Sequence, residues 1–394
     1  MNMPSASGSE EASDASSSRV MAPAIDFPTE WAFLPDDVAM IARRVDRDGF
    51  GSRSETPHRV LDFWPLRSKE TASWTFGLEF EFAYADAGWV AAELFARGLV
   101  ASPEPVAYHA PRVAGMWSVE HDSTVTTVFH GGDGADAVPS VAVGGEVVSP
   151  PLRDCPETWA QISAVLSVLR ECGAEVNGQT GLHVHFGAQA LRDSTDVSAT
   201  EHEAAQRFVR RVTRLAVLAN ACFEDVLFRM ASAEGGRHRG RPFFYRHSRP
   251  LEQPLGRHYD TIDALAQSLG KPGAARRAAL NLTNIGSSDK DTVEFRQSNG
   301  TLDVRVVRAF VQLCVLLVGA ARWVPESVRV DPQPLGFHHA DRDDAGVHAD
   351  DTAFWRMLTA ICPDGLPVDA AANLLWLFRR GSWQPGLADL ARGW

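Results

Sequence analysis

The sequence predicts a protein of the α+β class, because strand and helix patterns both occur along the chain. Residues 76–82, FGLEFEF, alternate apolar and acidic side chains, which is the period-two pattern of a β-strand. Residues 208–230 instead repeat apolar side chains every three or four positions, the spacing of an amphipathic helix. With 394 residues, of which 45% are hydrophobic and 22% charged, the chain can bury a large core.

The first half of the chain is expected to begin with a disordered tail over 1–24, rich in serine and acids, and a mixed arm over 25–70. From residue 71 the patterns sharpen into a main domain. The turn-rich sequence GGDG at 131–134 favours a hairpin. Strands are expected at 76–82, 116–119, 125–129 and 141–148, and a short helix at 88–99.

Helix boundaries in the second half are marked by capping residues. Asp154, Pro156 and Gly173 bracket one helix, since proline favours the first turn and glycine follows the last. Thr200 and Glu203 form a capping-box pair before the long amphipathic helix. Beyond it we expect a helix at 260–269, a hairpin of 280–285 and 292–297, a buried helix after 301, and helices at 353–361 and 370–379. The main domain is expected to span 71–325, with a helical extension over 326–394 packed on it.

Composition excludes several classes of protein. The formal net charge of −12 argues against general affinity for nucleic acid or anionic membrane, which needs clustered cations. The five cysteines are widely spaced without a C-x-x-C pair, which suits reduced thiols in a cytoplasm. The N-terminus lacks the basic and apolar regions of a signal peptide. The apolar run 309–320 is too short to cross a bilayer, so a buried helix is expected.

Three strands far apart in the sequence each place two ionisable side chains on one face and large apolar side chains on the other. Glu79 and Glu81 share a face of the first strand. The same alternation occurs in GLHVHFG, with His183 and His185, and in TVEFRQ, with Glu294 and Arg296. A fourth segment, GGEVVSPP, adds Glu146.

Each of these strands alone is most simply interpreted as the solvated face of an antiparallel sheet, and an HVH sequence alone as an ordinary strand pair. Taken together they favour a site, because exposed faces normally mix Lys, Thr, Ser and Gln with acids. If the strands are neighbours, several carboxylates gather and need cations. Oxygen-rich ligands with an imidazole favour Mg²⁺ or Mn²⁺ over zinc. Arg296 beside Glu294 suits a phosphate oxygen.

No G-x-x-x-x-G-K-[ST] loop and no convincing G-x-G-x-x-G after a strand is present. A nucleotide would therefore be held by metal ions and arginines.

The ordered motifs GLEFEF, HDS, GGEVVSPPL, NGQTGLHVHFG and TVEFRQSNGTLD resemble the amidoligase family, relatives of glutamine synthetase and glutamate-cysteine ligase. The resemblance covers about residues 76–316. It implies a curved antiparallel sheet of the glutamine synthetase-like catalytic type, flanked by helices, whose concave face holds divalent ions and ATP.

Carried over residue by residue, the resemblance implies metal ligands and residues that contact the nucleotide. His185 and Arg296 resemble the residues that contact nucleotide and the transferring phosphoryl group. Asp122 matches a separated acidic position with a less defined role, here assigned to cofactor binding. The implied metal ligands are Glu79, Glu81, Glu146, His183 and Glu294.

The reaction that the resemblance implies is the formation of an amide from a carboxylate and an amine of small-molecule or peptide substrates, through an acyl phosphate made with ATP. No ammonium or glutamate site of glutamine synthetase is recognisable. The arginine-rich stretch 235–250 is interpreted either as a solvated loop or as an anion clamp in which Arg241 and Arg246 act with the catalytic residues Glu294 and Arg296.

Two other functions stay open from the sequence. A metal-dependent hydrolase built on His183 and His185 would bind zinc or iron and need no ATP. A non-catalytic protein would keep the fold to hold a nucleotide or peptide. The oligomeric state cannot be inferred from the sequence.

Overall fold

The structure is a computed structural model that describes residues 35–48, 71–107, 110–125, 127–128, 142–192, 200–232, 237–238, 241–242, 248, 255, 258–269, 275–324 and 351–381. The expected tail, most of the expected arm and the GGDG turn lie outside these residues. Within the arm, the structure shows helix α1 (Pro35–Asp48), where the sequence gave no clear pattern.

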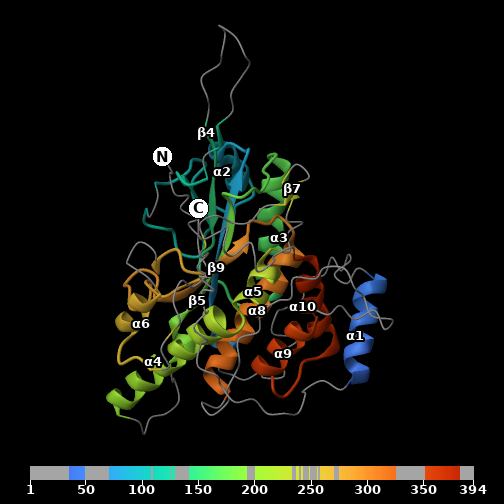
Figure 1. The fold of residues 1–394 in the computed structure, drawn as a ribbon. Coiled ribbons are helices and arrows are strands. Elements are labelled where there is room, and N and C mark those ends of the chain that lie inside the picture. Colours follow the sequence, from blue (N-terminus) through green and yellow to red (C-terminus); the bar gives the residue numbers. More distant parts are fainter. Residues whose placement is uncertain are drawn as a thin grey trace, which may run out of the picture.

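A seven-stranded antiparallel sheet forms the centre of the described part of the chain (Figure 1). Its strand order is β2-β4-β1-β5-β9-β8, and β3 pairs with β4 as the predicted hairpin requires. The α+β class with an antiparallel sheet is therefore confirmed. The strands are β1 (Phe76–Ala83), β2 (Ser118–Glu120), β3 (Thr127–Val128), β4 (Ala142–Val148), β5 (Gly181–Gly187), β8 (Leu280–Asn281) and β9 (Thr292–Asn299).

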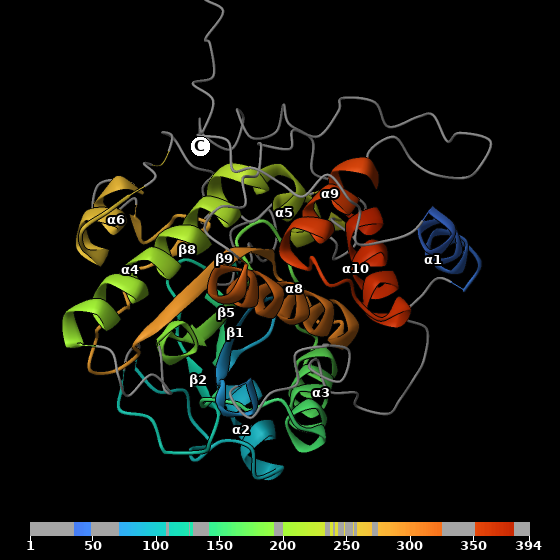
Figure 2. The ribbon, with the colours of Figure 1, turned by 90° about the horizontal axis from the view of Figure 1, so that it is seen from below.

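The apolar face of the sheet is covered by helices. Phe80 and Phe82 of β1 are 1% and 0% exposed, as the alternation in FGLEFEF predicts. The ring of Phe76 stacks on Trp159 of α3 (Pro156–Glu171), with centroids 6.0 Å apart. Figure 2 shows α3 beside α8 (Val304–Trp323), which contacts β5, while α2 (Ala87–Ala96) contacts β2 and β4. Burial of these side chains is the main stabilisation of the fold.

Helix α8 is the predicted buried helix, and it is longer than the apolar run that marked it. It spans 20 residues and is long and apolar enough to cross a membrane by length and composition. Its most apolar window is 83% buried against other parts of the protein. A core helix passes the same test, so α8 is best explained as the central helix of the core.

The long amphipathic helix is interrupted, contrary to the prediction of one helix to Met230. Helix α4 (Glu201–Val217) begins with the predicted capping box of Thr200 and Glu203. A π-helical turn over Leu218–Cys222 follows, closed by a hydrogen bond from Phe223 N to Leu218 O. Helix α5 (Glu224–Ala231) begins after this turn, is buried along its whole length and packs on β9 and α10. Periodicity alone does not reveal such an insertion.

The start of α3 differs from the prediction, which placed Asp154 at its N-terminal boundary. Cys155 occupies the N-cap position, while Asp154 Oδ1 accepts a hydrogen bond from Trp159 Nε1 at 2.7 Å. The predicted C-terminal signal is confirmed, since Gly173 follows the helix with φ of +78°.

The C-terminal helices pack on the rest of the molecule through α10 (Val368–Arg380), which contacts α1, α5 and α8 (Figure 1). Helix α9 (Asp351–Ile361) is joined to it by an ion pair from Arg379 to the fully buried Asp351, 2.5 Å long. Helix α6 (Ile262–Ser268) and the two-residue strands β6 (Arg237–His238) and β7 (Arg241–Pro242) complete the fold with 3₁₀ turns at Thr71–Ser73 and Ala188–Leu191. The expected domain boundaries at 71 and 325 stay a prediction.

The core beneath β1 is expected to be sensitive to cavity formation. Phe80→Ala should lower the free energy of unfolding by about 3–5 kcal/mol, since it removes a fully packed ring. Phe95→Ala on α2 is the matched control, because Phe95 is 47% exposed. Urea unfolding at neutral pH measures both. Equal losses for the two variants would contradict the packing described here.

Candidate functional site

The strand order brings the four predicted segments side by side. Glu79 lies opposite His183, and Glu81 lies opposite Glu146. On the other side of β5, His185 lies opposite Glu294. The polar face is buried rather than solvated, which excludes the simplest interpretation of the alternating pattern. Its five glutamates are each 0–8% exposed: Glu79, Glu81, Glu120, Glu146 and Glu294.

A β-bulge lies at the centre of this face. Val184 pairs with Phe295 and Leu182 pairs with Ser298, so that His183 alone stands opposite two residues of β9. These two residues are Arg296 and Gln297. Bulges re-aim side chains and are frequent beside active sites.

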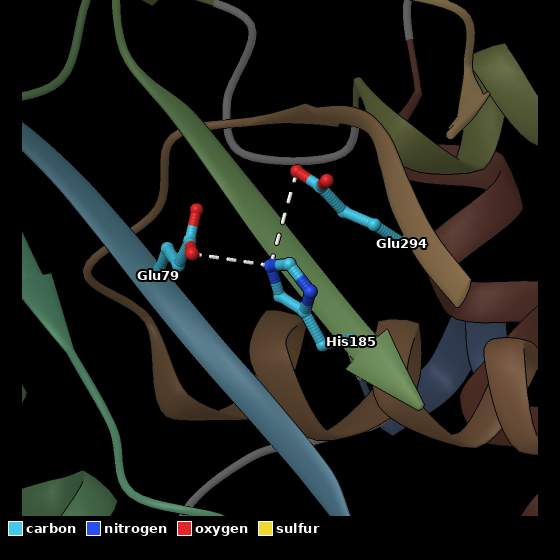
Figure 3. A group of neighbouring side chains, drawn as sticks. All are labelled: Glu79, His185 and Glu294. Carbon is cyan, nitrogen blue, oxygen red and sulfur yellow. Dashed lines mark ion pairs between the residues drawn. The ribbon is translucent and has the colours of Figure 1, made fainter. Parts of the chain in front are cut away.

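The first cluster consists of Glu79, His185 and Glu294, whose ligand atoms all lie within 4.8 Å of one another. Figure 3 shows the imidazole of His185 between the two carboxylates. His185 Nε2 lies 3.2 Å from Glu79 Oε1 and 3.8 Å from Glu294 Oε1. The other ring nitrogen, Nδ1, lies 3.1 Å from Thr292 Oγ1. Within the described part of the chain, the buried Nε2 has no hydrogen-bond partner.

This arrangement fits a divalent cation. With a metal ion bound, Nδ1 of His185 would keep its proton and donate it to Thr292, and the Nε2 lone pair would serve as a ligand beside the two carboxylates. His185 Nε2 makes no well-aligned hydrogen bond although the Glu79 carboxylate lies 3.2 Å away, and a bound ion would satisfy both groups. The donor set of two carboxylates and one imidazole suits Mg²⁺ or Mn²⁺.

The second cluster consists of Glu81, Asp122 and Glu146, also with ligand atoms within 4.8 Å of one another. Gly181 N donates to Glu81 Oε2 at 2.6 Å, which fixes that side chain. Asp122 lies on the loop after β2, and its Oδ1 accepts from Thr124 N at 2.7 Å. The structure thus places the acid of the HDS motif with two other carboxylates.

His183 lies between the two clusters. Its Nδ1 is 3.0 Å from Glu79 Oε2, and its Nε2 is 3.5 Å from Glu81 Oε1. Burial and the nearby Arg296 guanidinium lower the pKa of His183, which favours the neutral ring. The assignment of His183 as metal ligand and His185 as nucleotide contact stays a prediction, since the geometry brings both rings to Glu79.

Charge interactions keep the first cluster ionised. Burial by itself would raise the pKa of Glu79, but His185, His183 and Lys290 outweigh it and hold that pKa well below its usual value. Burial also opposes ionisation of Glu294, yet the charges of Arg296 and His185 bring its pKa to about 2. Both carboxylates are therefore negative at neutral pH.

The second cluster has the opposite balance. Burial, together with the charges of Glu79, Glu81 and Asp122, raises the pKa of Glu146 well above its usual value. Burial is the largest cause and repulsion among the carboxylates adds to it, whereas beside Glu79 the histidines and Lys290 outweigh burial. A divalent ion at this cluster would remove the repulsion and release a proton.

Several residues of the site were not found from the sequence. The amides of Asn281 and Asn284 both donate to Glu294 Oε2, at 2.7 and 3.2 Å, which leaves Oε1 directed at the first cluster. The pairing of Asn281 with Glu294 in the predicted hairpin was the signal that would have found the first of them. Lys290 contacts Glu79, and it lies in a turn without any pattern.

Arg112 also enters the site from a loop. Its Nε donates to Glu120 Oε1 at 2.9 Å, and Ser118 Oγ donates to the same oxygen at 3.1 Å. Glu120 lies opposite Glu146 on the neighbouring strand. The loop position of Arg112 carries no periodic signal, so sequence analysis missed it.

Arg296 lies as predicted beside Glu294, to whose Oε1 it donates a hydrogen bond, and its Nη1 is 3.5 Å from His183 Nδ1. Arg246 and the side chain of Arg241, the two arginines of the predicted anion clamp, lie outside the described residues.

A cavity of about 360 Å³ opens beside the first cluster. Glu79, His185 and Lys290 line it together with Arg112. Its apolar lining comes from the segment 113–116 and from residues 148–151. The cavity therefore joins the first cluster to a space of the size that holds a small molecule.

Comparison with protein families supports the resemblance. A family model described as "Putative amidoligase enzyme" matches residues 72–206, about a third of the chain. The match includes β1, β4 and β5, and with them Glu79, Glu146 and both histidines. It confirms the resemblance to amidoligases and supports an amide-forming ligase at the coarse level, while β9 lies beyond it.

Solved structures give distant likenesses. A bifunctional glutathione synthetase from Pasteurella multocida is 10% identical with a TM-score of 0.37, and the match covers 78% of this chain and 46% of that chain. A novel glutamine synthase homolog is 12% identical with a TM-score of 0.32, covering 81% of this chain and 70% of that chain. The chain thus spans under half the length of the glutathione synthetase. No curated protein matches the sequence.

The raised pKa of Glu146 predicts how the metal-free protein responds to pH. As pH rises above the ordinary value of 4.5, the unfolded state loses the proton and the folded state keeps it. Stability from this group therefore falls as pH rises, by about 1.4 kcal/mol for each unit by which the pKa is raised. Glu146→Gln should be more stable than wild type in EDTA, by a margin that grows between pH 5 and pH 8.

Melting temperatures of both proteins across this pH range measure the difference. Glu104→Gln, which removes the charge of an exposed loop glutamate, is the control and should show no growing margin. A constant margin for Glu146→Gln would show that Glu146 is ionised without metal.

Proposed function

We propose that the protein is an ATP-dependent ligase that joins a carboxylate to an amine, with Mg²⁺ or Mn²⁺ held at the two clusters. The observation that carries the proposal is the buried polar face, on which two carboxylate clusters flank His183 next to a cavity. Burial of so many acids is unfavourable unless cations accompany them. The family match over residues 72–206 supports the amide-forming reaction class.

The cluster composition favours hard divalent ions over zinc. The first cluster would bind through Glu79, His185 and Glu294, with His183 as a further candidate, and the second through Glu81, Asp122 and Glu146. Carboxylate oxygens predominate, whereas catalytic zinc commonly takes more histidine or cysteine. Bound divalent ions would neutralise phosphate oxygens and hold a nucleotide in place.

The proposed reaction proceeds in two balanced steps. A carboxylate oxygen of the substrate attacks the γ-phosphorus of ATP, the bond to the bridging oxygen breaks, and ADP leaves. The amine then attacks the carbonyl carbon of the acyl phosphate, phosphate leaves with the former carboxylate oxygen, and the amine loses a proton. Phosphorylation is needed because a carboxylate is a poor electrophile.

The protein's own side chains would position the reactants and balance charge. Arg296, fixed by Glu294, presents a guanidinium suited to a phosphoryl oxygen. Asn281 and Asn284 orient Glu294 and are positioning residues. We keep Arg241 and Arg246 as proposed members of an anion clamp. The carboxylate and amine are proposed to be small molecules or peptides, with no role for nucleic acid or membrane.

The first test is thermal unfolding with Mg²⁺, with a non-hydrolysable ATP analogue, and with both. At one hundred times its dissociation constant a ligand stabilises the native state by about 2.7 kcal/mol. We expect this stabilisation to require both components in wild type, and to be lost in Glu79→Gln and in Glu294→Gln. Glu104→Gln is the control and should respond as wild type does.

Other outcomes would point elsewhere. Stabilisation by zinc alone, without any effect of nucleotide, would favour a metal-dependent hydrolase using His183 and His185. Nucleotide binding that survives both substitutions would indicate a binding protein without metal-dependent chemistry. No response of wild type to either component would remove the basis of the ligase proposal.

A further inference from the structure

Lys290 occupies an unusual place in the first cluster. Its ammonium lies 3.0 Å from Glu79 Oε1, the same oxygen that lies 3.2 Å from His185 Nε2. The ammonium therefore sits on the carboxylate edge that a divalent ion at this cluster would use. The buried His185 Nε2 makes no well-aligned hydrogen bond within the described part of the chain and faces that same edge.

The cations of the protein already balance the carboxylates of this cluster. Lys290 pairs with Glu79, and Arg296 pairs with Glu294. Each of the two carboxylates thus already has a lysine or arginine partner without any metal. A divalent ion would add two positive charges to a buried site, which is costly unless an anion follows or a protein cation withdraws.

Lys290 is placed where it can withdraw. It lies in the turn between β8 and β9, next to Asp291, whose main-chain N–H donates to Ser287 O. Its side chain is 27% exposed, whereas that of Glu79 is 10% exposed. Arg296, by contrast, extends from the strand β9 and is 17% exposed. A long side chain on a turn can change partner by rotating its own torsions.

The cavity is the space into which the ammonium would turn. Lys290 and Arg112 both line it, and the positive charge of Arg112 opposes the raised pKa of Lys290. Arg112 forms an ion pair with Glu120 of β2, at the opposite edge of the sheet from the turn that carries Lys290. Asp289 and Asp291 also line the cavity, but Asp291 is engaged by Arg192 and by Gly286 N. Free of Glu79, Lys290 would make the cavity a site for anionic oxygens.

We propose that Lys290 couples cation binding to anion binding: it holds Glu79 in the metal-free protein, and when a divalent ion binds it moves to the cavity and binds a carboxylate or phosphate group of a reactant together with Arg112. This rests on the proposed function, because it takes the first cluster to be a divalent-cation site. It assigns Lys290 as a binding residue. The same role accounts for the presence of Lys290 and Arg112 in the lining of a cavity whose other walls are largely apolar.

The first arm of the test measures Mn²⁺ affinity alone, from the electron paramagnetic resonance signal of free Mn²⁺. Lys290→Met removes the competing charge with little change of shape, and should bind Mn²⁺ more tightly by about tenfold, the scale of a charge-assisted hydrogen bond. Lys290→Arg keeps the charge and is the matched control, so its affinity should stay near that of wild type. Unchanged affinity in Lys290→Met would overturn the proposal.

The second arm measures anion binding at saturating Mn²⁺, as thermal stabilisation by glutarate and separately by a non-hydrolysable ATP analogue. Lys290→Met should lose about tenfold in affinity for one of them, and the one affected identifies the group as carboxylate or phosphate. If neither probe is affected, Lys290 is not an anion ligand and the proposal fails.

Failure of the proposed function is distinguishable from failure of this inference. If wild type itself binds no Mn²⁺, the cation site is absent and both fall. If wild type binds Mn²⁺ and nucleotide but Lys290→Met behaves as wild type in both arms, the ligase proposal stands and only the role of Lys290 is wrong. Melting of Lys290→Met without ligand shows that the variant is folded.

Discussion

Repulsion among buried carboxylates is the constraint on which this structure depends. Five glutamates lie on one face of a single sheet, none more than 8% exposed. Such a face is stable only where each charge meets a cation, a hydrogen-bond donor or a proton. The surrounding loops supply these partners: Lys290 and Arg112 come from turns, while Arg296 comes from the sheet itself. The buried acidic face therefore requires cationic side chains from the surrounding loops to balance its charge.

The two clusters meet this constraint in different ways. The first is balanced by protein cations and stays ionised, with the pKa of Glu294 at about 2. In the second, burial and then carboxylate repulsion raise the pKa of Glu146. At the first cluster a divalent ion would compete with Lys290 for Glu79, and at the second it would compete with a proton for Glu146. His183 lies between them, within 3.5 Å of Glu79 and Glu81. A change of charge at one cluster therefore alters the electrostatic energy of the other.

The apolar face gives this arrangement its rigidity. Phe80 and Phe82 alternate with the acids of β1 and are buried in the same hydrophobic core as residues of α2, α3 and α8, which fixes the register. A shift of one residue would turn the acids into the hydrophobic core. The strand β9, which carries the bulge opposite His183, packs on α5, the helix that follows the π-helical turn after α4.

The sequence by itself determined which side chains share a face, because alternation along a strand is a local property with a period of two. It therefore predicted the strands, the buried α8 and the acids, histidines and arginine of the polar face. Only the tertiary structure decided that β4, β1, β5 and β9 are neighbours, that their polar face is buried, and that the acids divide into two clusters. Lys290, Asn281 and Arg112 likewise became part of the site only through folding. Lys290 reaches Glu79 across 211 positions of the chain, and Arg112 and Asn281 reach Glu120 and Glu294 from a loop and a neighbouring strand. Burial and electrostatic balance depend on such contacts rather than on any local pattern.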